Sequence, residues 1–334
     1  IFSGNLDEFF MVRVGSLMDL DRVAPESRDP LSGMSPSRQM KHICKNTRYL
    51  YYKREQIYEK VRKNLREKGI WIKNNEELTG PEREVCLSYL RDVLLKQVSI
   101  RFLSGIDGLP ELKNNQTVLL GKLDEGYYSV VTFPEEMPAL LTLENSSAGF
   151  IGIRTPDVLM EFFDKWMLPF QAKEKLLLRV TRNAEFREGE EDELLKADFR
   201  AQIQKMLRER STQPLVRLEI RGGCSDSFRE ELIAKFKISK KHCFTTTAPL
   251  EYGFLDELKE FLPKATFRTL SYPRYTPRST PTFFEEKVVD YAKREDILSS
   301  YPYDSMMPLL RMLKEAATDD RVREIRMTIY RLSS

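Results

Sequence analysis

Apolar side chains recur at steps of three and four residues along the first hundred positions, which is the spacing that one face of an α-helix presents. The first helical stretch follows Ser3 and Asn5, both of which are good N-capping residues. The second begins at Ser35, where the next residue is a proline suited to a first helical turn, and it ends near Gly69. The third follows Thr79. Together these helices predict an antiparallel helical bundle.

The pattern changes after residue 100, where short apolar runs are divided by glycine, asparagine and proline. Such runs are typical of β-strands, and the first four predict a meander. The predicted strands are Thr117–Leu123, Tyr127–Phe133, Ala139–Leu143, Gly149–Ile153, Leu176–Thr181 and Leu215–Ile220. The predicted helices of this region are Thr155–Leu168, Asp192–Glu209 and Ser225–Phe236. The middle of the chain is therefore expected to be an α+β domain.

A proline-rich segment, Tyr272–Pro281, predicts an extended connection and marks a domain boundary. Helices are expected beyond it, near Glu285–Lys293 and Ser305–Ala317, and alternation over Val322–Leu332 predicts a strand. A lone strand cannot pair its backbone groups or bury both faces, so we expect the chain to stop inside a domain. The expected domains are residues 1–69, residues 70–277 and residues 278–334.

The composition is that of a globular protein, with 41% hydrophobic and 31% charged residues in a chain of 334. No apolar run approaches the roughly 18 residues that cross a bilayer. Lys and Arg total 54 against 51 Asp and Glu, so the net charge of +3 does not by itself indicate a polyanion partner. One segment departs from this balance, because residues 38–68 hold eleven Lys or Arg and three Glu. That face is either a solvated helix surface or a surface for a polyanion.

Few residues suggest chemistry on their own. The four cysteines are spread singly, which disfavours a disulfide framework or a structural zinc site and is typical of a reducing cytosol. His42 and His242 lie in charged stretches and are expected to be solvated or boundary residues. No nucleotide-binding glycine loop, nucleophile elbow or zinc-protease motif is present. Composition and periodicity alone therefore indicate a multidomain protein of unknown activity.

Four collinear segments resemble the motifs of the long-type bacterial polyphosphate kinase family. Residues 3–13, SGNLDEFFMVR, resemble its N-terminal signature, and residues 180–185, VTRNAE, resemble its middle-domain motif. Arg294–Leu298 together with Tyr301–Ser305 resembles the entry to its first catalytic domain, and Ile329–Leu332 resembles the strand that follows. The resemblance covers essentially the whole chain.

This resemblance implies a multidomain α and α+β fold: a helical bundle, then an α+β middle domain, then the truncated start of an α/β phospholipase-D-like domain. It implies reversible transfer of the terminal phosphate of ATP to polyphosphate through a phosphohistidine intermediate, with Mg²⁺ as cofactor. The catalytic histidines are expected beyond the end of this chain, so the chain alone is expected to be inactive. Neither His42 nor His242 lies in a matching motif.

The implied ligands are ATP or ADP and polyphosphate. The implied assembly is a homodimer or homotetramer formed through the N-terminal and middle domains. Nucleic acid is not an expected partner, and no transmembrane segment is expected. The implied location is the cytoplasm, with peripheral association with the inner membrane as an alternative.

Two site residues are carried over by their positions in these motifs. Asn5 matches the family residue that contacts the base of ATP, and an amide suits an adenine edge because it has both a donor and an acceptor. Its alternative role is a helix cap. Arg331 matches a family arginine at the phosphate and magnesium site. Since Mg²⁺ prefers oxygen ligands, we interpret Arg331 as a bidentate phosphate clamp beside the metal, or alternatively as a surface charge at a strand end.

The competing functional class is a non-catalytic binding or dimerisation module with a basic helical surface. The two classes differ in whether the encoded protein continues past Ser334 into two histidine-containing α/β domains.

Overall fold

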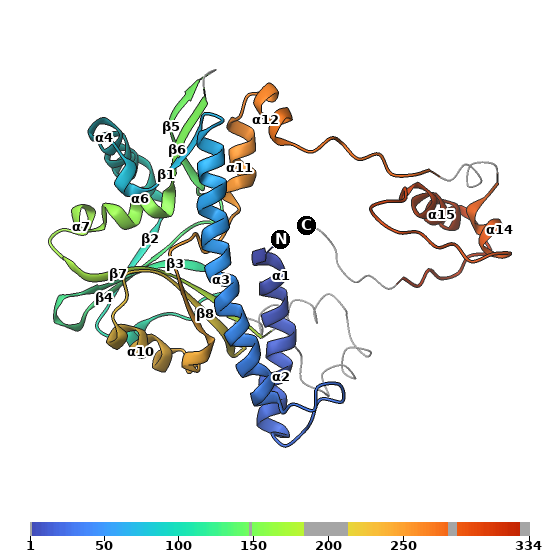
Figure 1. The fold of residues 1–334 in the computed structure, drawn as a ribbon, viewed down its shortest axis with the longest axis horizontal. Coiled ribbons are helices and arrows are strands. Elements are labelled where there is room, and N and C mark those ends of the chain that lie inside the picture. The colour runs from blue at the N-terminus through green and yellow to red at the C-terminus, as the bar shows by residue number, and fades with distance from the viewer. Residues whose placement is uncertain (1, 147–148, 184–212, 280–285, 328–334) are drawn as a thin grey trace. The chain divides into compact units, whose positions relative to one another are not determined.

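The N-terminal region is helical in the computed structural model, as its apolar spacing predicts (Figure 1). The structure describes residues 2–146, 149–183, 213–279 and 286–327. Helix α1 (Phe2–Phe9) continues through a π-helical stretch, η1 (Phe10–Val14), into α2 (Gly15–Val23). Ser3 and Asn5 lie inside α1, so the expectation that they precede the helix is wrong.

Helix α3 (Pro36–Arg66) is 31 residues long, and Ser35 caps it as expected. The Ser35 hydroxyl accepts a hydrogen bond from the backbone N–H of Arg38 at 3.4 Å. The side chains that α3 buries are Pro36, Met40, Cys44, Thr47, Tyr51, Arg54 and Arg62. Arginine is rarely buried without a partner, so α3 must pack against charged groups as well as apolar ones.

Two β-sheets follow in the described part of the chain. The six-stranded sheet has the order β2-β4-β3-β7-β8-β9, in which only the β8–β9 pair is parallel. The three-stranded sheet has the order β1-β6-β5, with β1 parallel to β6. The strands are β1 (Ile70–Lys73), β2 (Ser99–Leu103), β3 (Thr117–Leu123), β4 (Tyr128–Thr132), β5 (Leu140–Ser146), β6 (Gly149–Arg154), β7 (Ala172–Arg182), β8 (Leu215–Gly222) and β9 (Cys243–Thr246).

The six predicted strands are confirmed, but the first four do not form one meander. β3 and β4 pair in the larger sheet, whereas β5 and β6 pair in the smaller one. The connection between them contains Pro134 and Pro138, which supply no backbone donor and so help the chain to leave the first sheet. Strands β1, β2 and β9 were not predicted. β1 and β9 have four residues each, which carry little periodic signal, and β2 has no buried residue that would mark it as an apolar run.

Short helices pack around both sheets. They are η2 (Asn75–Glu77), α4 (Gly80–Tyr89), η3 (Leu90–Leu94), α5 (Leu95–Gln97), η4 (Ile106–Gly108), η5 (Asp124–Gly126), α6 (Thr155–Glu161), α7 (Phe163–Trp166), α10 (Asp226–Lys235), η6 (Lys240–His242) and α11 (Phe254–Phe261). The prediction of a helix over residues 155–168 is confirmed through Trp166, and that over residues 225–236 is confirmed as α10. The helix predicted over residues 192–209 lies outside the described residues.

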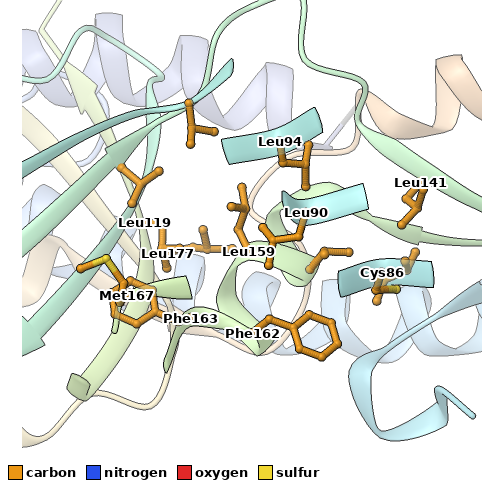
Figure 2. Packing of buried hydrophobic residues seen from close by; sticks show 14 of the residues in the cluster. Cys86, Leu90, Leu94, Leu119, Leu141, Leu159, Phe162, Phe163, Met167 and Leu177 are labelled. Atoms are coloured by element: carbon orange, nitrogen blue, oxygen red, sulfur yellow. The ribbon is translucent and has the colours of Figure 1, made fainter. Parts of the chain in front are cut away.

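The helix that follows Thr79 belongs to the α/β core and not to a bundle with α2 and α3. Figure 2 shows Cys86, Leu90 and Leu94 in the same group of buried side chains as Leu119 of β3 and Leu177 of β7. All five side chains belong to one buried cluster. The apolar stripe that predicted a bundle partner is therefore buried against a sheet, which a sequence pattern cannot distinguish from a neighbouring helix.

The chain divides into two compact units, residues 1–264 and residues 265–334. The second unit contains most of α12 (Lys264–Leu270), together with α14 (Val288–Ala292) and α15 (Met307–Thr318), which confirm the two helices predicted there. The segment 271–279 is extended as predicted, and Arg278 forms an isolated bridge to Asp304. Residues 322–327 form no strand, so the described half of that prediction is wrong. No described segment pairs with them, and an unpaired strand leaves its backbone groups unsatisfied.

Phe163 tests the core of the first unit. Its ring is fully buried and packs at 5.0 Å, between ring centroids, against Trp166. Phe163→Ala should lower the free energy of unfolding by about 3–5 kcal/mol, because a large cavity replaces the ring. Both tryptophans, Trp71 and Trp166, lie in the first unit, so urea unfolding followed by tryptophan fluorescence reports on that unit.

The control for this variant is Leu168→Ala, since the Leu168 side chain is 69% exposed. It should change stability by no more than about 0.5 kcal/mol. Equal effects of the two substitutions would show that the cluster in Figure 2 does not hold the first unit together.

Candidate functional site

Helix α1 carries one of the two residues that the sequence assigns to a site. Asn5 is exposed on α1, inside the helix, which excludes the helix-cap alternative. Arg331 lies outside the described residues.

Two positions after Asn5, the side chain of Asp7 points the other way and is buried, with a relative exposure of 8% for the residue. A buried carboxylate requires partners, and these define how α1 is held.

Two arginines from neighbouring strands of the six-stranded sheet bind Asp7. Arg179 of β7 donates two hydrogen bonds, from Nη1 to Oδ1 at 3.1 Å and from Nη2 to Oδ2 at 2.8 Å. Arg217 of β8 donates from Nη2 to Oδ1 of the same carboxylate. This two-pronged contact with Arg179 is the geometry in which a guanidinium binds a carboxylate most strongly. We call the three residues the Asp7 clamp.

A second carboxylate, that of Glu219 on β8, lies within ion-pair distance of both arginines of the clamp. Its Oε2 lies 3.1 Å from Nη1 of Arg179 and 3.2 Å from Nη2 of Arg217. Its Oε1 accepts a hydrogen bond from the Tyr51 hydroxyl of α3 at 2.5 Å. Nη1 of Arg54, also on α3, lies 3.8 Å from the same oxygen. The network therefore joins α1, α3, β7 and β8.

The electrostatics of the clamp favour its charged form. Burial by itself would raise the pKa of Asp7, but the hydrogen bonds and charges of Arg179 and Arg217 outweigh it and hold that pKa below its usual value. Burial would lower the pKa of Arg179, and its two carboxylate partners raise it instead. The pKa of the Tyr51 phenol is raised by burial and by the neighbouring Glu219. The tyrosine is thus a neutral donor at physiological pH.

Aromatic rings close the network off from solvent. Phe10 is fully buried and packs edge to face on Phe244 of β9, with 5.7 Å between ring centroids. The Tyr51 ring stacks on the Phe244 ring, with 5.1 Å between ring centroids. The guanidinium of Arg217 lies 5.1 Å from the centre of the Phe10 ring. Excluding water in this way strengthens the charged hydrogen bonds of the clamp.

A second contact fixes the helix further along. A Cβ atom added to Gly15 would lie 2.0 Å from Oδ1 of Asn183, so any larger residue would force the Asn183 amide out of its place beside α2. Nδ2 of Asn183 donates to Oδ2 of Asp19 at 2.7 Å. Asn183, in the described part of the second motif, therefore contacts α2, the helix that continues the chain directly after the first motif and η1.

His242 is buried, with 1% relative exposure, so the expectation of a solvated or boundary residue is wrong for it. Its Nδ1 lies 2.8 Å from the carbonyl oxygen of Val216, and burial lowers its pKa. His42 is exposed, as expected. The buried imidazole packs between η6 and β8, where it supports the strand that carries Arg217.

A cavity of about 670 Å³ lies elsewhere in the first unit. It is lined by the segments 113–117, 133–137 and 154–156 and by residues at the start of α11. Two of its polar atoms, Oδ1 of Asn115 and Oγ1 of Thr117, are buried without a hydrogen-bond partner among the described residues. Asn5 does not line it, so the cavity and the exposed face of α1 are separate features.

Comparison with known proteins identifies the architecture. Residues 1–73 match a family model described as the polyphosphate kinase N-terminal domain, and residues 82–258 match the polyphosphate kinase middle domain. Residues 287–334 match the polyphosphate kinase C-terminal domain 1. The chain belongs to the polyphosphate kinase family. The resemblance drawn from its motifs is therefore confirmed.

Curated polyphosphate kinases resemble the chain along its whole length. The protein from Staphylococcus epidermidis is 27% identical over 343 residues, which cover 100% of this chain and 45% of that protein. The protein from Helicobacter pylori is 25% identical and is matched over 50% of its length. The chain thus spans about half the length of the curated relatives it matches. The crystal structure of polyphosphate kinase from Porphyromonas gingivalis has the same fold, with a TM-score of 0.64 at 17% identity over 96% of this chain and 45% of that chain.

The Asp7 clamp of this polyphosphate kinase chain was not predicted, although Asp7 lies in the first motif, residues 3–13. A signal was present in the predicted strand 215–220, where Arg217 and Glu219 interrupt an otherwise apolar run. Charged residues at alternate positions of a strand that is buried on both faces must be paired. The identity of their partners depends on tertiary packing and could not be read from the spacing.

Asp7→Asn tests the clamp. The substitution keeps the shape of the side chain but leaves Glu219 as the one carboxylate that pairs with both Arg179 and Arg217. One buried positive charge then has no counter-charge, so the free energy of unfolding should fall by about 3–5 kcal/mol near neutral pH. The pKa of Asp7 is lower in the folded state than the roughly 3.9 of an unfolded Asp. The stabilisation is therefore present above about pH 4 and is lost as the pH falls toward the folded-state pKa.

Urea unfolding at a series of pH values measures both effects. The difference between the wild type and Asp7→Asn should shrink as the pH falls from about 6 to about 3. Asp92→Asn, at an exposed position of η3, is the matched control and should follow the wild type throughout. A difference that does not depend on pH would show that the Asp7 charge contributes nothing.

Proposed function

We propose that the protein containing this chain transfers the terminal phosphate of ATP reversibly to inorganic polyphosphate through a phosphohistidine intermediate. The observation that carries the proposal is the match to three polyphosphate kinase domains in their order along one chain. The catalytic histidines are proposed to lie outside this chain. His242 is unsuited to the role because it is buried against a backbone carbonyl.

The geometry of α1 supports a role for Asn5 in nucleotide binding. The Asp7 clamp fixes the rotation of the helix about its axis, and Asn5 then points away from the buried face. A fixed amide at an exposed position can offer its donor and acceptor to an adenine edge without first being ordered. We therefore propose that the clamp pre-organises Asn5 for the base of ATP.

Arg331 and magnesium belong to the same proposal. Among the residues that the structure describes, no group of three His, Cys, Asp or Glu side chains is placed to hold a metal ion. These residues do not fit magnesium. Arg331 is proposed to bind a phosphate with its two-donor fork, beside a metal held by other groups.

Assembly and location are proposals as well. We propose a homodimer or homotetramer, formed through the N-terminal and middle domains, in the cytoplasm. No helix among the described residues is long and apolar enough to cross a bilayer. Peripheral association with the inner membrane stays an alternative.

The function is tested on the full-length protein with ATP labelled at its terminal phosphate. The proposal expects label in an acid-stable polymer and on a histidine, and it expects ATP when ADP and polyphosphate are supplied instead. The chain 1–334 alone should do neither, because covalent catalysis needs the nucleophile. Transfer by a full-length protein that forms no phosphohistidine would refute the proposed intermediate.

Asn5→Ala in the full-length protein should weaken ATP binding by about 1 kcal/mol, which is the scale of one hydrogen bond. It should leave polyphosphate binding unchanged. Isothermal titration with each ligand measures both values. Asn64→Ala, at an equally exposed position of α3, is the control. Equal losses for both ligands would assign Asn5 to folding and not to the nucleotide.

Arg331→Ala should lower single-turnover phosphorylation of the catalytic histidine on the order of a hundredfold, the range seen when one charge-stabilising donor is removed. Arg331→Lys should fall between the wild type and Arg331→Ala, because it keeps the charge but loses the planar fork. Circular dichroism must show that both variants are folded, and Arg326→Ala is the control. A folded Arg331→Ala that reacts at the wild-type rate would make Arg331 a surface charge.

A further inference from the structure

Helix α3 has a cationic face that the proposed nucleotide site does not use. The buried stripe of α3 follows Met40, Cys44, Thr47, Tyr51, Arg54 and Arg62. On the helix surface, residues three and four apart share a face, so the exposed residues at 41, 45, 49, 52, 56, 60 and 63 form a stripe opposite the buried one. The exposed cations on and beside this stripe are Arg38, Lys41, Lys45, Lys53, Lys60 and Lys63. We call these six residues the α3 track.

The charge of this segment differs from that of the remaining chain. Residues 38–68 contain eleven Lys or Arg and three Glu, a net charge of +8, in a chain whose net charge is +3. The remainder of the chain is therefore net acidic. A soluble helix usually mixes both signs on its exposed face, and pairs of opposite charge at i and i+4 stabilise it. The α3 track instead keeps like charges together, which costs stability unless an anion binds there.

The acidic residues of α3 do not neutralise the track. Both carboxylate oxygens of Glu59 accept from Arg62, at 3.1 and 3.0 Å. Glu55 accepts from the Thr246 hydroxyl at 2.7 Å and from the Thr247 backbone at 2.8 Å. Across the described residues, no cation of the track forms an ion pair with a carboxylate. Glu55 is thus engaged with the end of β9, and Glu59, although its side chain is 64% exposed, is paired with the buried Arg62 and not with a cation of the track.

The shape of the track suits a long linear anion. Arg38 and Lys63 are 25 positions apart, which corresponds to about 38 Å along a helix. A small anion can contact only neighbouring cations, whereas an extended polymer can contact all of them at once. Lysine side chains are flexible point charges, and these bind phosphate without requiring a fixed geometry.

Two tyrosines in the middle of the track help to identify the polymer. Tyr49 and Tyr52 are 58% and 56% exposed, and exposed rings could stack on nucleic acid bases. However, Nζ of Lys53 lies over the Tyr49 ring at 4.9 Å from its centre, and the Tyr52 hydroxyl accepts from Gln56 at 2.7 Å. One face of the first ring is therefore covered by a charge, which favours a polymer of phosphates without bases.

We propose that the α3 track binds polyphosphate chains away from the site of phosphate transfer. This inference rests on the proposed function, since it names the same polymer as its ligand. The track would bind the part of a long polyphosphate chain that is distant from the transfer site. It should therefore strengthen the binding of long polyphosphate but not the binding of tripolyphosphate or nucleotides.

The test compares two quadruple variants of this chain. Lys41→Gln, Lys45→Gln, Lys60→Gln and Lys63→Gln together remove four charges of the track. Arg91→Gln, Lys96→Gln, Arg101→Gln and Lys237→Gln remove four exposed charges from other elements, so the two variants have the same net charge. Gln and Lys have nearly equal helix propensities, and circular dichroism checks that α3 is kept.

Fluorescence anisotropy with labelled long-chain polyphosphate, titrated at several salt concentrations, measures the binding. The track variant should bind on the order of tenfold more weakly at moderate salt, and the slope of log K against log salt should fall by about 3 in magnitude, since each lost contact removes roughly 0.7. The control variant and the wild type should agree. Equal weakening of both variants would overturn the proposal, because it would reflect net charge alone.

Two further ligands, a single-stranded RNA and phosphatidylglycerol vesicles, distinguish polyphosphate binding from binding to nucleic acid or to a membrane surface. Tighter binding of single-stranded RNA than of polyphosphate would overturn the proposal in favour of nucleic acid, and binding only to phosphatidylglycerol vesicles would overturn it in favour of a membrane surface. In the full-length protein, the track variant should raise KM for long polyphosphate severalfold with kcat and the nucleotide KM unchanged. A wild type without any transfer activity would refute the proposed function but would leave the anisotropy result intact.

Discussion

The buried ion pair between Asp7 and two arginines is the interaction on which the arrangement of the first unit depends. Removing charged groups from water costs several kcal/mol for each ion, and the attraction between them offsets that cost only when the geometry is good. Here Arg179 and Arg217 reach Asp7 from adjacent strands, and Glu219 balances the second positive charge. Since Glu219 alone cannot neutralise two buried arginines, the Asp7 carboxylate is needed as well, and helix α1 is bound to the sheet in one orientation.

This constraint also determines which faces of the two N-terminal helices α1 and α3 are exposed. One side of the continuous α1 and η1 segment buries Asp7 and Phe10, so Asn5 faces outward. Helix α3 contributes Tyr51 and Arg54 to the same network, so its lysines are directed away from the sheets. Both proposed ligand contacts, one for the nucleotide and one for polyphosphate, are thus on surfaces whose orientation is set by buried charges.

The sequence predicted most of the helices and strands, but it predicted less well how they pack against one another. Helix and strand spacing located α3, β3, β7 and α10 because each has enough residues for its period to be read. It failed for β1, which has four residues, and for β2, which has no buried residue. It also failed for the partner of α4, because an apolar stripe does not identify the element that covers it. Asn5 was found through its motif, whereas Asp7 in the same motif was overlooked. Its partners are more than 170 positions away, and only the fold brings them together.

Native-state hydrogen exchange measures the central claim most directly. If the Asp7 clamp makes α1 part of the sheet's cooperative unit, the amides of α1 and η1 should exchange with the same opening free energy as those of β7 and β8. Their exchange should respond equally to added denaturant. Opening of α1 at a much lower free energy, while β7 and β8 stay protected, would contradict the account, because the helix would then remove the Asp7 carboxylate from the two buried arginines at little cost.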